Sequence, residues 1–445
     1  MKIINYIIYC VLLLLPSLLN GQAVFTNAGA NIQIFGTTGG ASHLDLVIIG
    51  DYENQTDINS NDGIVDLANS ANIFITGNWL NNSFSNVFLP TSTSLDDGFV
   101  TFQNNTVNQL IGGVSPTFFE NIVVVGTRKI LSNNNNSING SLILDAPLDL
   151  NSNTFEIKNN SSNAIAYSSG FIKSETLPGA TGYIKWNIGN AVANFSIPFG
   201  SDGASQSDDL RLDINIKNPM SISDYFLFAT YPTDMYNQPM PNGASPLETE
   251  VRKVVDRYWL LEPSDINHIP NLDIVFSYSS NDISKNYNSI NPDLLFASRN
   301  NTTLGKWLDM DPRGYNYLNK VEIKNVLPSE FFSSWTLLNT PPALEDLFVP
   351  TAFTPDGDGL NDVFLPTFQV DFEVIDYEMI IFNRWGETVF VSKDKDIGWD
   401  GHISGNSADP QIGVYSWVIL LKGRSYGSAV EGVRKKFTGM VTLFL

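Results

Sequence analysis

The sequence predicts an all-β protein, and three observations support that prediction. Charged residues make up only 16% of the chain against 12% for aromatic residues, and Asn, Ser, Thr and Gly take the place of charges. Short apolar runs rich in β-branched residues alternate with Asn, Gly and Asp turns. The apolar spacing shows no helical period over residues 22–165. This combination is typical of paired or stacked strands.

Length and charge limit the class of protein further. The chain has 445 residues, enough for two to four domains of ~100–200 residues each. Its formal net charge of −21 repels phosphate backbones, so we expect no nucleic-acid partner. Only one cysteine, Cys10, is present, and it lies in the leader. The mature chain is therefore expected to have no disulfide, and its stability must come from buried core.

The first 21 residues predict a secretory signal peptide. Lys2 supplies the positive start, residues 3–15 form an almost unbroken apolar run, and residues 16–21 are the small and polar end. The run is too short for a typical membrane span. Cys10 lacks the small-residue context of a lipoprotein site, so we expect Sec export to the periplasm and cleavage near Gly21–Gln22.

Residues 22–165 form a repetitive β-rich region. Gly50, Tyr52 and Asn54 share their order and spacing with Gly77, Trp79 and Asn81. Each copy is followed by a second Asp-Gly element, at residues 62–65 and 97–100, and residues 139–144 resemble a third, degenerate copy. Repeated strand–turn units that cannot bury their own apolar faces tend to stack. The region is thus expected to be β-solenoid-like, with a β-sandwich as the alternative because the spacing is irregular.

Residues 166–340 change character. Tryptophan and proline become frequent, and residues 210–216 alternate as in a half-buried strand. Strands at this spacing predict an antiparallel β-sandwich. Residues 247–258 fit either a short helix or a charged strand. A Pro-Pro pair then marks a linker at residues 341–346.

Residues 347–445 form a compact last unit. Strand-like runs lie at residues 379–382, 387–390, 415–420 and 439–444, bounded by Gly, Asp or Pro turns. The pattern predicts a small Ig-like β-sandwich whose closing strand runs to the end of the chain.

Several landmarks of this unit stand in a fixed order. They are VPTAFTPDGDGLND at 349–362, IFNRWG at 381–386, GWDG at 398–401, GVYSW at 413–417 and GMVTL at 439–443. Together they resemble the gliding motility-associated C-terminal domain of Bacteroidetes, the type B sorting domain of the type IX secretion system. The resemblance implies export across the outer membrane by the type IX machinery, and contact with an outer-membrane partner of that system. The residues that carry the motif are Pro355, Gly357, Gly359, Asn361, Asn383, Arg384, Trp385, Gly386, Trp399, Asp400, Gly401, Gly413, Tyr415, Trp417 and Gly439.

The sharpest candidate for chemistry is an acidic loop. Asp356, Asp358 and Asp362 are separated by glycines, which permit the positive φ angles of a tight ligand loop. Carboxylates at this spacing predict a Ca²⁺ site. A turn whose Asp side chains cap backbone N–H groups is the alternative, and it is favoured over calcium. Residues 57–66 match a calcium loop less well.

Two other groups have both a functional and a structural interpretation. Arg384 and Trp385 are either a recognition patch for the secretion partner or a stacked pair inside the small domain, with the interior pair favoured. Five aromatic residues form either a glycan-stacking face or core, with core favoured: Tyr52, Trp79, Trp186, Trp259 and Trp307. No nucleophile elbow, phosphate loop or metal-binding histidine spacing is present, so we expect no catalytic residues and no enzyme.

The sequence therefore predicts a structural or adhesion protein of the outer cell surface or the extracellular space, exported by the type IX system. Surface glycans or other cells are its expected partners. A carbohydrate-binding protein or glycan hydrolase with the same export signal is one alternative. A component of the gliding or secretion apparatus is the other.

Overall fold

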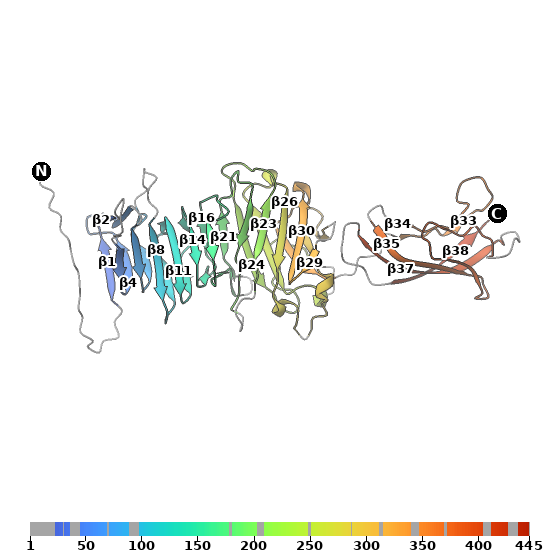
Figure 1. The fold of residues 1–445 in the computed structure, drawn as a ribbon, viewed down its shortest axis with the longest axis horizontal. Coiled ribbons are helices and arrows are strands. Elements are labelled where there is room, and N and C mark those ends of the chain that lie inside the picture. The colour runs from blue at the N-terminus through green and yellow to red at the C-terminus, as the bar shows by residue number, and fades with distance from the viewer. Residues whose placement is uncertain are drawn as a thin grey trace.

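A computed structural model describes the fold of the chain (Figure 1). It describes residues 23–29, 31–35, 45–68, 71–88, 98–177, 180–202, 209–247, 251–285, 287–310, 315–339, 347–368, 372–403, 411–425 and 435–444. The predicted signal peptide and the predicted linker at 341–346 lie outside these residues. The described part consists of strands and short 3₁₀ helices, which confirms the all-β prediction. None of its helices is long and apolar enough to cross a membrane.

The first part of the chain winds through three faces of parallel strands, one after another (Figure 1). The first face is a seven-stranded sheet of β1 (Val24–Ala28), β4 (Asp51–Gln55), β7 (Trp79–Asn82), β9 (Gln109–Gly113), β12 (Lys129–Leu131), β15 (Leu148–Asp149) and β18 (Ile172–Lys173). The second face holds β2 (Asn31–Phe35) and β5 (Ile64–Ala68), then β10 (Phe118–Phe119), β13 (Asn136–Ile138), β16 (Thr154–Ile157) and β21 (Tyr183–Trp186). The third face holds β3 (Asp45–Ile48), β6 (Asn72–Ile75), β8 (Phe99–Asn104), β11 (Asn121–Gly126), β14 (Leu142–Leu144) and β17 (Ile165–Tyr167). Each coil visits the faces in this order, which is the winding of a β-solenoid.

The internal repeat corresponds to two neighbouring coils. Tyr52 pairs with Trp79 in the parallel register of β4 and β7, and their rings stack with centroids 4.2 Å apart. Asn54 and Asn81 are both fully buried, and the Asn54 amide donates to the Asn81 side chain at 3.5 Å. A Cβ on Gly77 would lie 2.2 Å from the backbone of Gly50, so the coils can approach this closely only because glycine stands there. The repeat therefore specifies the stacking of one coil on the next.

The second element of the repeat does not follow this stacking. Residues 64–68 form β5 on the second face, whereas residues 99–104 form β8 on the third face. The two Asp-Gly elements are thus not equivalent in space. The reason is a mismatch of spacing: the two Asp-Gly elements are 35 positions apart, whereas the third face repeats after 27, with Ile73 paired to Val100.

The middle of the chain is built from two antiparallel sheets. One extends the second face of the solenoid from β21 through β24 (Phe226–Pro232), β25 (Arg257–Pro263), β31 (Ser334–Leu338), β27 (Phe296–Asn301) and β28 (Lys306–Asp309). The other contains β22 (Asn194–Ile197), β23 (Leu212–Ile216), β26 (Leu272–Ser277), β30 (Lys320–Val326) and β29 (Tyr315–Tyr317). A small hairpin pairs β19 (Glu175–Leu177) with β20 (Ala180–Thr181). The two large sheets pack face to face, with Trp259 of one 5.3 Å from Phe276 of the other.

One hydrophobic core runs through both parts. It extends from Ile34 in the solenoid to Leu337 in β31, so the solenoid coils and the antiparallel sheets bury a common interior. The segment that fitted either a helix or a strand contributes both, with 3₁₀ helix η1 (Val251–Lys253) leading into β25. The other 3₁₀ helices are η2 (Ile266–His268), η3 (Ser280–Asp282), η4 (Pro292–Leu294) and η5 (Pro328–Glu330).

A lysine buried at a corner of the solenoid makes the folding stability depend on pH, and this dependence tests whether the side chain is buried. The Lys129 side chain is fully buried and donates to the carbonyl oxygens of Val125 at 2.8 Å and Thr127 at 2.6 Å. Burial lowers the pKa of Lys129 from 10.5 to about 8. Between these values the unfolded chain holds a proton that the folded chain has released, so folding stability rises with pH there.

We expect the free energy of unfolding of the wild type, measured relative to Lys129→Met, to rise by about 1–3 kcal/mol between pH 8 and 10.5. Urea unfolding of both proteins across this range measures it, and the titration of the tyrosines cancels in the difference. A difference that does not change with pH would contradict a depressed lysine pKa.

The last unit has a core of its own. A five-stranded sheet contains β33 (Ala352–Phe353), β38 (Lys435–Leu443), β37 (Gly413–Ser425), β35 (Phe372–Phe382) and β36 (Thr388–Ser392). A two-stranded sheet of β32 (Leu347–Phe348) and β34 (Thr367–Phe368) accompanies it. The core cluster runs from Phe353 to Leu443 and includes the buried Trp399.

Candidate functional site

The sorting motifs gather at one end of the five-stranded sheet of the last unit. We call this the loop end: β33, β35 and β38 finish there and β37 begins there. The strand register sets it, because Leu443 pairs with both Phe353 and Gly413. Phe382, the last residue of β35, pairs with Ser416 three residues into β37. Sequence blocks that lie far apart in the chain are thereby brought to one end of the sheet.

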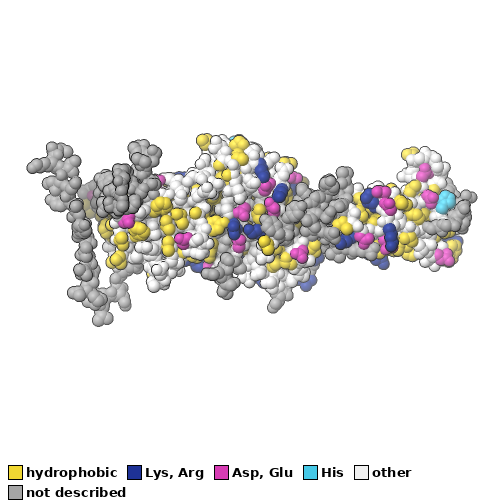
Figure 2. Space-filling model, in the orientation of Figure 1, with side chains coloured by type: hydrophobic (Ala, Val, Ile, Leu, Met, Phe, Trp, Pro, Cys, Tyr) yellow, Lys and Arg dark blue, Asp and Glu magenta, His cyan; other side chains and the backbone are white. Residues whose placement is uncertain are grey.

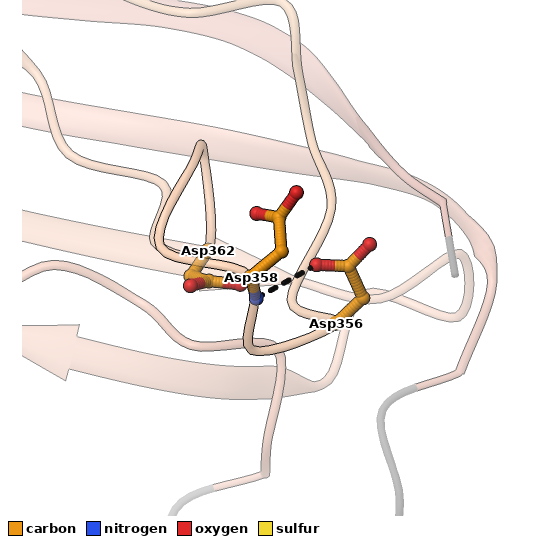
Figure 3. A group of neighbouring side chains, drawn as sticks. All are labelled: Asp356, Asp358 and Asp362. Carbon is orange, nitrogen blue, oxygen red and sulfur yellow. Dashed lines mark hydrogen bonds between the residues drawn. The ribbon is translucent and has the colours of Figure 1, made fainter.

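The acidic loop follows β33 at this end (Figure 3). Asp356, Asp358 and Asp362 each place a carboxylate oxygen within 4.8 Å of the others. Among the residues that the structure describes, this is the only group of three or more His, Cys, Asp or Glu side chains close enough to share a metal ion. The Asp362 carboxylate accepts the backbone N–H groups of Gly357 and Gly359, both at 2.8 Å. Asp356 accepts the N–H of Asp358 at 3.2 Å.

These hydrogen bonds explain the residue types in the loop. Gly357, Gly359 and Asn361 all have positive φ angles, of 80°, 88° and 56°. Glycine and asparagine tolerate this conformation best. The carboxylates therefore act as turn caps, and their oxygens also lie close enough together, within 4.8 Å, for a hard cation to be bound between them. The geometry is compatible with both interpretations made from the sequence.

A substitution separates turn capping from calcium binding. We expect Asp362→Ala to lower the free energy of unfolding of the sorting unit by about 1–2 kcal/mol in calcium-free buffer, because two hydrogen bonds are lost. Asp358→Asn keeps those bonds and is the control. If millimolar calcium raises the thermal midpoint of the wild type but not that of Asp358→Asn, the loop also holds the ion. Equal midpoints with and without calcium would leave turn capping as its role.

Arg384 and Trp385 sit in the tight turn between β35 and β36. The Asn383 side-chain oxygen accepts the N–H groups of Trp385 and Glu387, both at 3.0 Å, and Gly386 takes a φ of 81°. The Arg384 guanidinium lies 4.0 Å from the centroid of the Trp385 ring, a cation–π contact. Trp385 is 67% exposed, so the stacked pair lies on the surface and not inside the unit. A large exposed aromatic on a rigid turn is typical of a recognition surface.

The other motif residues lie in the core and in the turns next to the loop end. Trp399 is fully buried, packs against Tyr415 at 4.7 Å, and donates its indole N–H to the carbonyl of His402 at 2.8 Å. Asp400 accepts the backbone N–H of His402 at 3.0 Å and so shapes the turn that contains Gly401. Their role is to hold the loops in place.

Trp417 and Gly439 are paired across β37 and β38. A Cβ on Gly439 would lie 2.3 Å from the Trp417 ring, so glycine leaves the space that the indole fills. Gly413 begins β37 at the loop end, and Pro355 lies in the loop that follows β33.

The aromatic residues singled out in residues 22–340 do not form a glycan-stacking face. Four of them are fully buried: Tyr52, Trp79, Trp186 and Trp259. Trp307 is half-buried, stacks on Tyr258 at 5.6 Å and donates to the carbonyl of Ser245 at 2.7 Å. Core packing is therefore what these rings do, and the hypothesis that they bind glycans is wrong. Sequence alone could not separate the two roles, because both require large aromatic side chains.

The last unit thus belongs to the class of small β modules that have their own core and present loops at one end. Residues 347–443 match the CHU_C type IX secretion signal domain family, which confirms the resemblance drawn from the motifs. The chain accordingly carries a sorting domain that directs export by the type IX secretion system to the cell surface or the extracellular space, through interaction with the type IX machinery. No curated protein and no solved structure matches the chain.

Proposed function

We propose that the chain is a non-enzymatic surface protein, in which residues 22–340 form an adhesive or structural passenger and residues 347–445 are the export domain. The observation that carries the proposal is the single core that joins the solenoid and the antiparallel sheets. A core continuous over this length makes one stiff, elongated body (Figure 1). Such a body suits a protein that holds a contact at a distance from the cell.

The passenger surface fits contact with uncharged material. Side chains on the face shown in Figure 2 are mostly hydrophobic or uncharged polar over the solenoid part, and charged groups are sparse. Only 16% of the residues in the chain are charged. Uncharged polymers such as surface glycans carry no charge that the net negative chain would repel.

Export is proposed to take two steps. Residues 1–21 would direct Sec transport to the periplasm. The loop end of the sorting domain would then dock on an outer-membrane partner of the type IX system, with the exposed Trp385 as an anchor.

Attachment of a clean deletion strain tests the adhesive role. We expect weaker attachment to glycan-coated surfaces, restored by the full chain. It should not be restored by a form in which the sorting domain is kept but the solenoid is deleted. Normal attachment of the deletion strain would contradict the adhesion proposal. Stoichiometric copurification with the outer-membrane machinery would instead favour a component of the gliding or secretion apparatus.

A further inference from the structure

A groove lies where the solenoid passes into the antiparallel sheets. The third face of the solenoid ends at β17, and the smaller antiparallel sheet begins at β22, so each of these strands is the edge of its sheet. A cavity beside the C-terminal ends of these two strands has a volume of about 460 Å³. This lies within the range of roughly 300–1,000 Å³ that small-ligand sites occupy. Its lining includes Tyr167, Phe171, Phe199, Asp209 and Arg211.

The polar groups of the groove surround one aromatic ring. Tyr167 is 36% exposed, and the Arg211 guanidinium lies 5.5 Å from the centroid of its ring. Asp209 holds that guanidinium through two hydrogen bonds, of 2.8 Å from the terminal nitrogen and 3.4 Å from Nε. The side chains of both charged residues remain partly exposed, 32% for Arg211 and 39% for Asp209. A ligand in the groove would thus meet fixed donors, fixed acceptors and an aromatic ring together.

The charge of the groove limits the class of ligand. Arg211 and Asp209 neutralise each other, which leaves no net positive charge to select a phosphate or sulfate. The guanidinium equally disfavours a bound cation. An uncharged ligand rich in hydroxyl groups satisfies both partners, since each hydroxyl both donates and accepts. Its C–H faces can pack against the tyrosine ring.

An extended peptide is the other ligand that sheet edges attract. The Tyr167 hydroxyl, however, lies 3.3 Å from the Ser196 hydroxyl of β22 and so bridges the two edges. An added strand would have to break this hydrogen bond to pass between β17 and β22. The side chains around the ring therefore favour a saccharide over a strand.

We propose that this groove binds a neutral saccharide, with Tyr167 as the stacking platform and the Arg211–Asp209 pair as the hydroxyl-binding group. The inference rests on the proposed adhesive function and deepens it by naming the ligand class. Sequence reasoning missed the site because Tyr167 belongs to no aromatic repeat. Only the fold brings it next to Arg211, which lies 44 positions further along the chain.

The test uses the full mature chain, residues 22–445. Neutral oligosaccharides of glucose, galactose, mannose and N-acetylglucosamine are screened on an array, and the best is titrated by calorimetry. We expect Tyr167→Ala to weaken binding at least about tenfold in a chain that circular dichroism shows to be still folded. Asp209→Asn should weaken it as well. Tyr236→Ala is the matched control, because Tyr236 is 62% exposed and lies outside the groove.

Three outcomes would overturn the inference. One is the absence of binding to any of these saccharides, another is binding that Tyr167→Ala leaves unchanged, and the third is tight binding of an extended peptide instead. Failure here is distinguishable from failure of the adhesive role. The purified protein could bind a saccharide while the deletion strain attaches normally. That result would support saccharide binding in the groove and contradict the adhesion proposal.

Discussion

Truncation of the chain after Pro342 is expected to trap the passenger in the periplasm and to abolish its surface exposure almost completely. The passenger core ends at Leu337, and the sorting domain buries a separate cluster that begins at Phe353. The cut therefore falls between two cores, and the passenger should fold with an unchanged thermal midpoint. What it loses is the domain that the type IX system recognises. Protease accessibility on intact cells, compared with osmotic-shock fractions, measures the effect in a host that has the system.

The full chain is the positive control, and a full chain with Trp385→Ala is the informative intermediate. Trp385 is largely exposed, so its removal should leave the sorting domain folded while weakening recognition at the loop end. Equal surface exposure of the truncated and full chains would show that residues 347–445 belong to the working structure and not to the export signal. Loss of export with Trp385→Ala in a folded protein would identify the turn after β35 as part of the docking surface.

The sequence predicted the solenoid coils best where their length is constant. The Gly-x-aromatic-x-Asn pattern recurs after 27 residues, and the structure stacks Tyr52 on Trp79 with that same spacing. Later coils change length, and hydrogen bonds between them join residues 32 apart at Leu110 but 19 apart at Thr117. One coil stacks on the next through the side chains and hydrogen bonds of its strands, and the loops between those strands can differ in length without disturbing these contacts. Self-similarity in the sequence therefore fades while the fold continues.

Other features were beyond the sequence because they depend on long-range pairing. The parallel second face passes into antiparallel strands at β21 and β24, where Trp186 pairs with Phe226, and no local pattern marks that change. The loop end is a similar case. The DGDG block and the NRWG block were each visible as motifs, but only the register of β33, β38, β37 and β35 places them at the same end of the sheet. Motif order alone was enough to identify the sorting domain. It could not show which motif residues lie together on the surface of that domain.

Trp79→Ala is expected to lower the free energy of unfolding of the passenger by about 3–5 kcal/mol, the largest effect of any single substitution proposed for this chain. The indole is fully buried between coils, stacks on Tyr52 and lies 5.5 Å from the ring of Phe119. Its N–H donates to the hydroxyl of Thr117 at 3.1 Å, so the substitution also leaves a buried hydroxyl without this donor. Urea unfolding followed by intrinsic fluorescence and circular dichroism measures the change.

Phe84→Ala is the matched control within the solenoid, since Phe84 is 83% exposed and its loss should cost no more than about 0.5 kcal/mol. The shape of the transition carries a second argument. Because one core joins the solenoid to the antiparallel sheets, loss of Trp79 should shift a single passenger transition to lower urea. Solenoid coils, however, gain their stability mainly from their neighbours. If the coils around β7 unfold first and leave a second transition at the wild-type midpoint, the shared core does not couple the two parts. A cost as small as that of Phe84→Ala would mean that the stack of Tyr52 on Trp79 is not what holds the coils together.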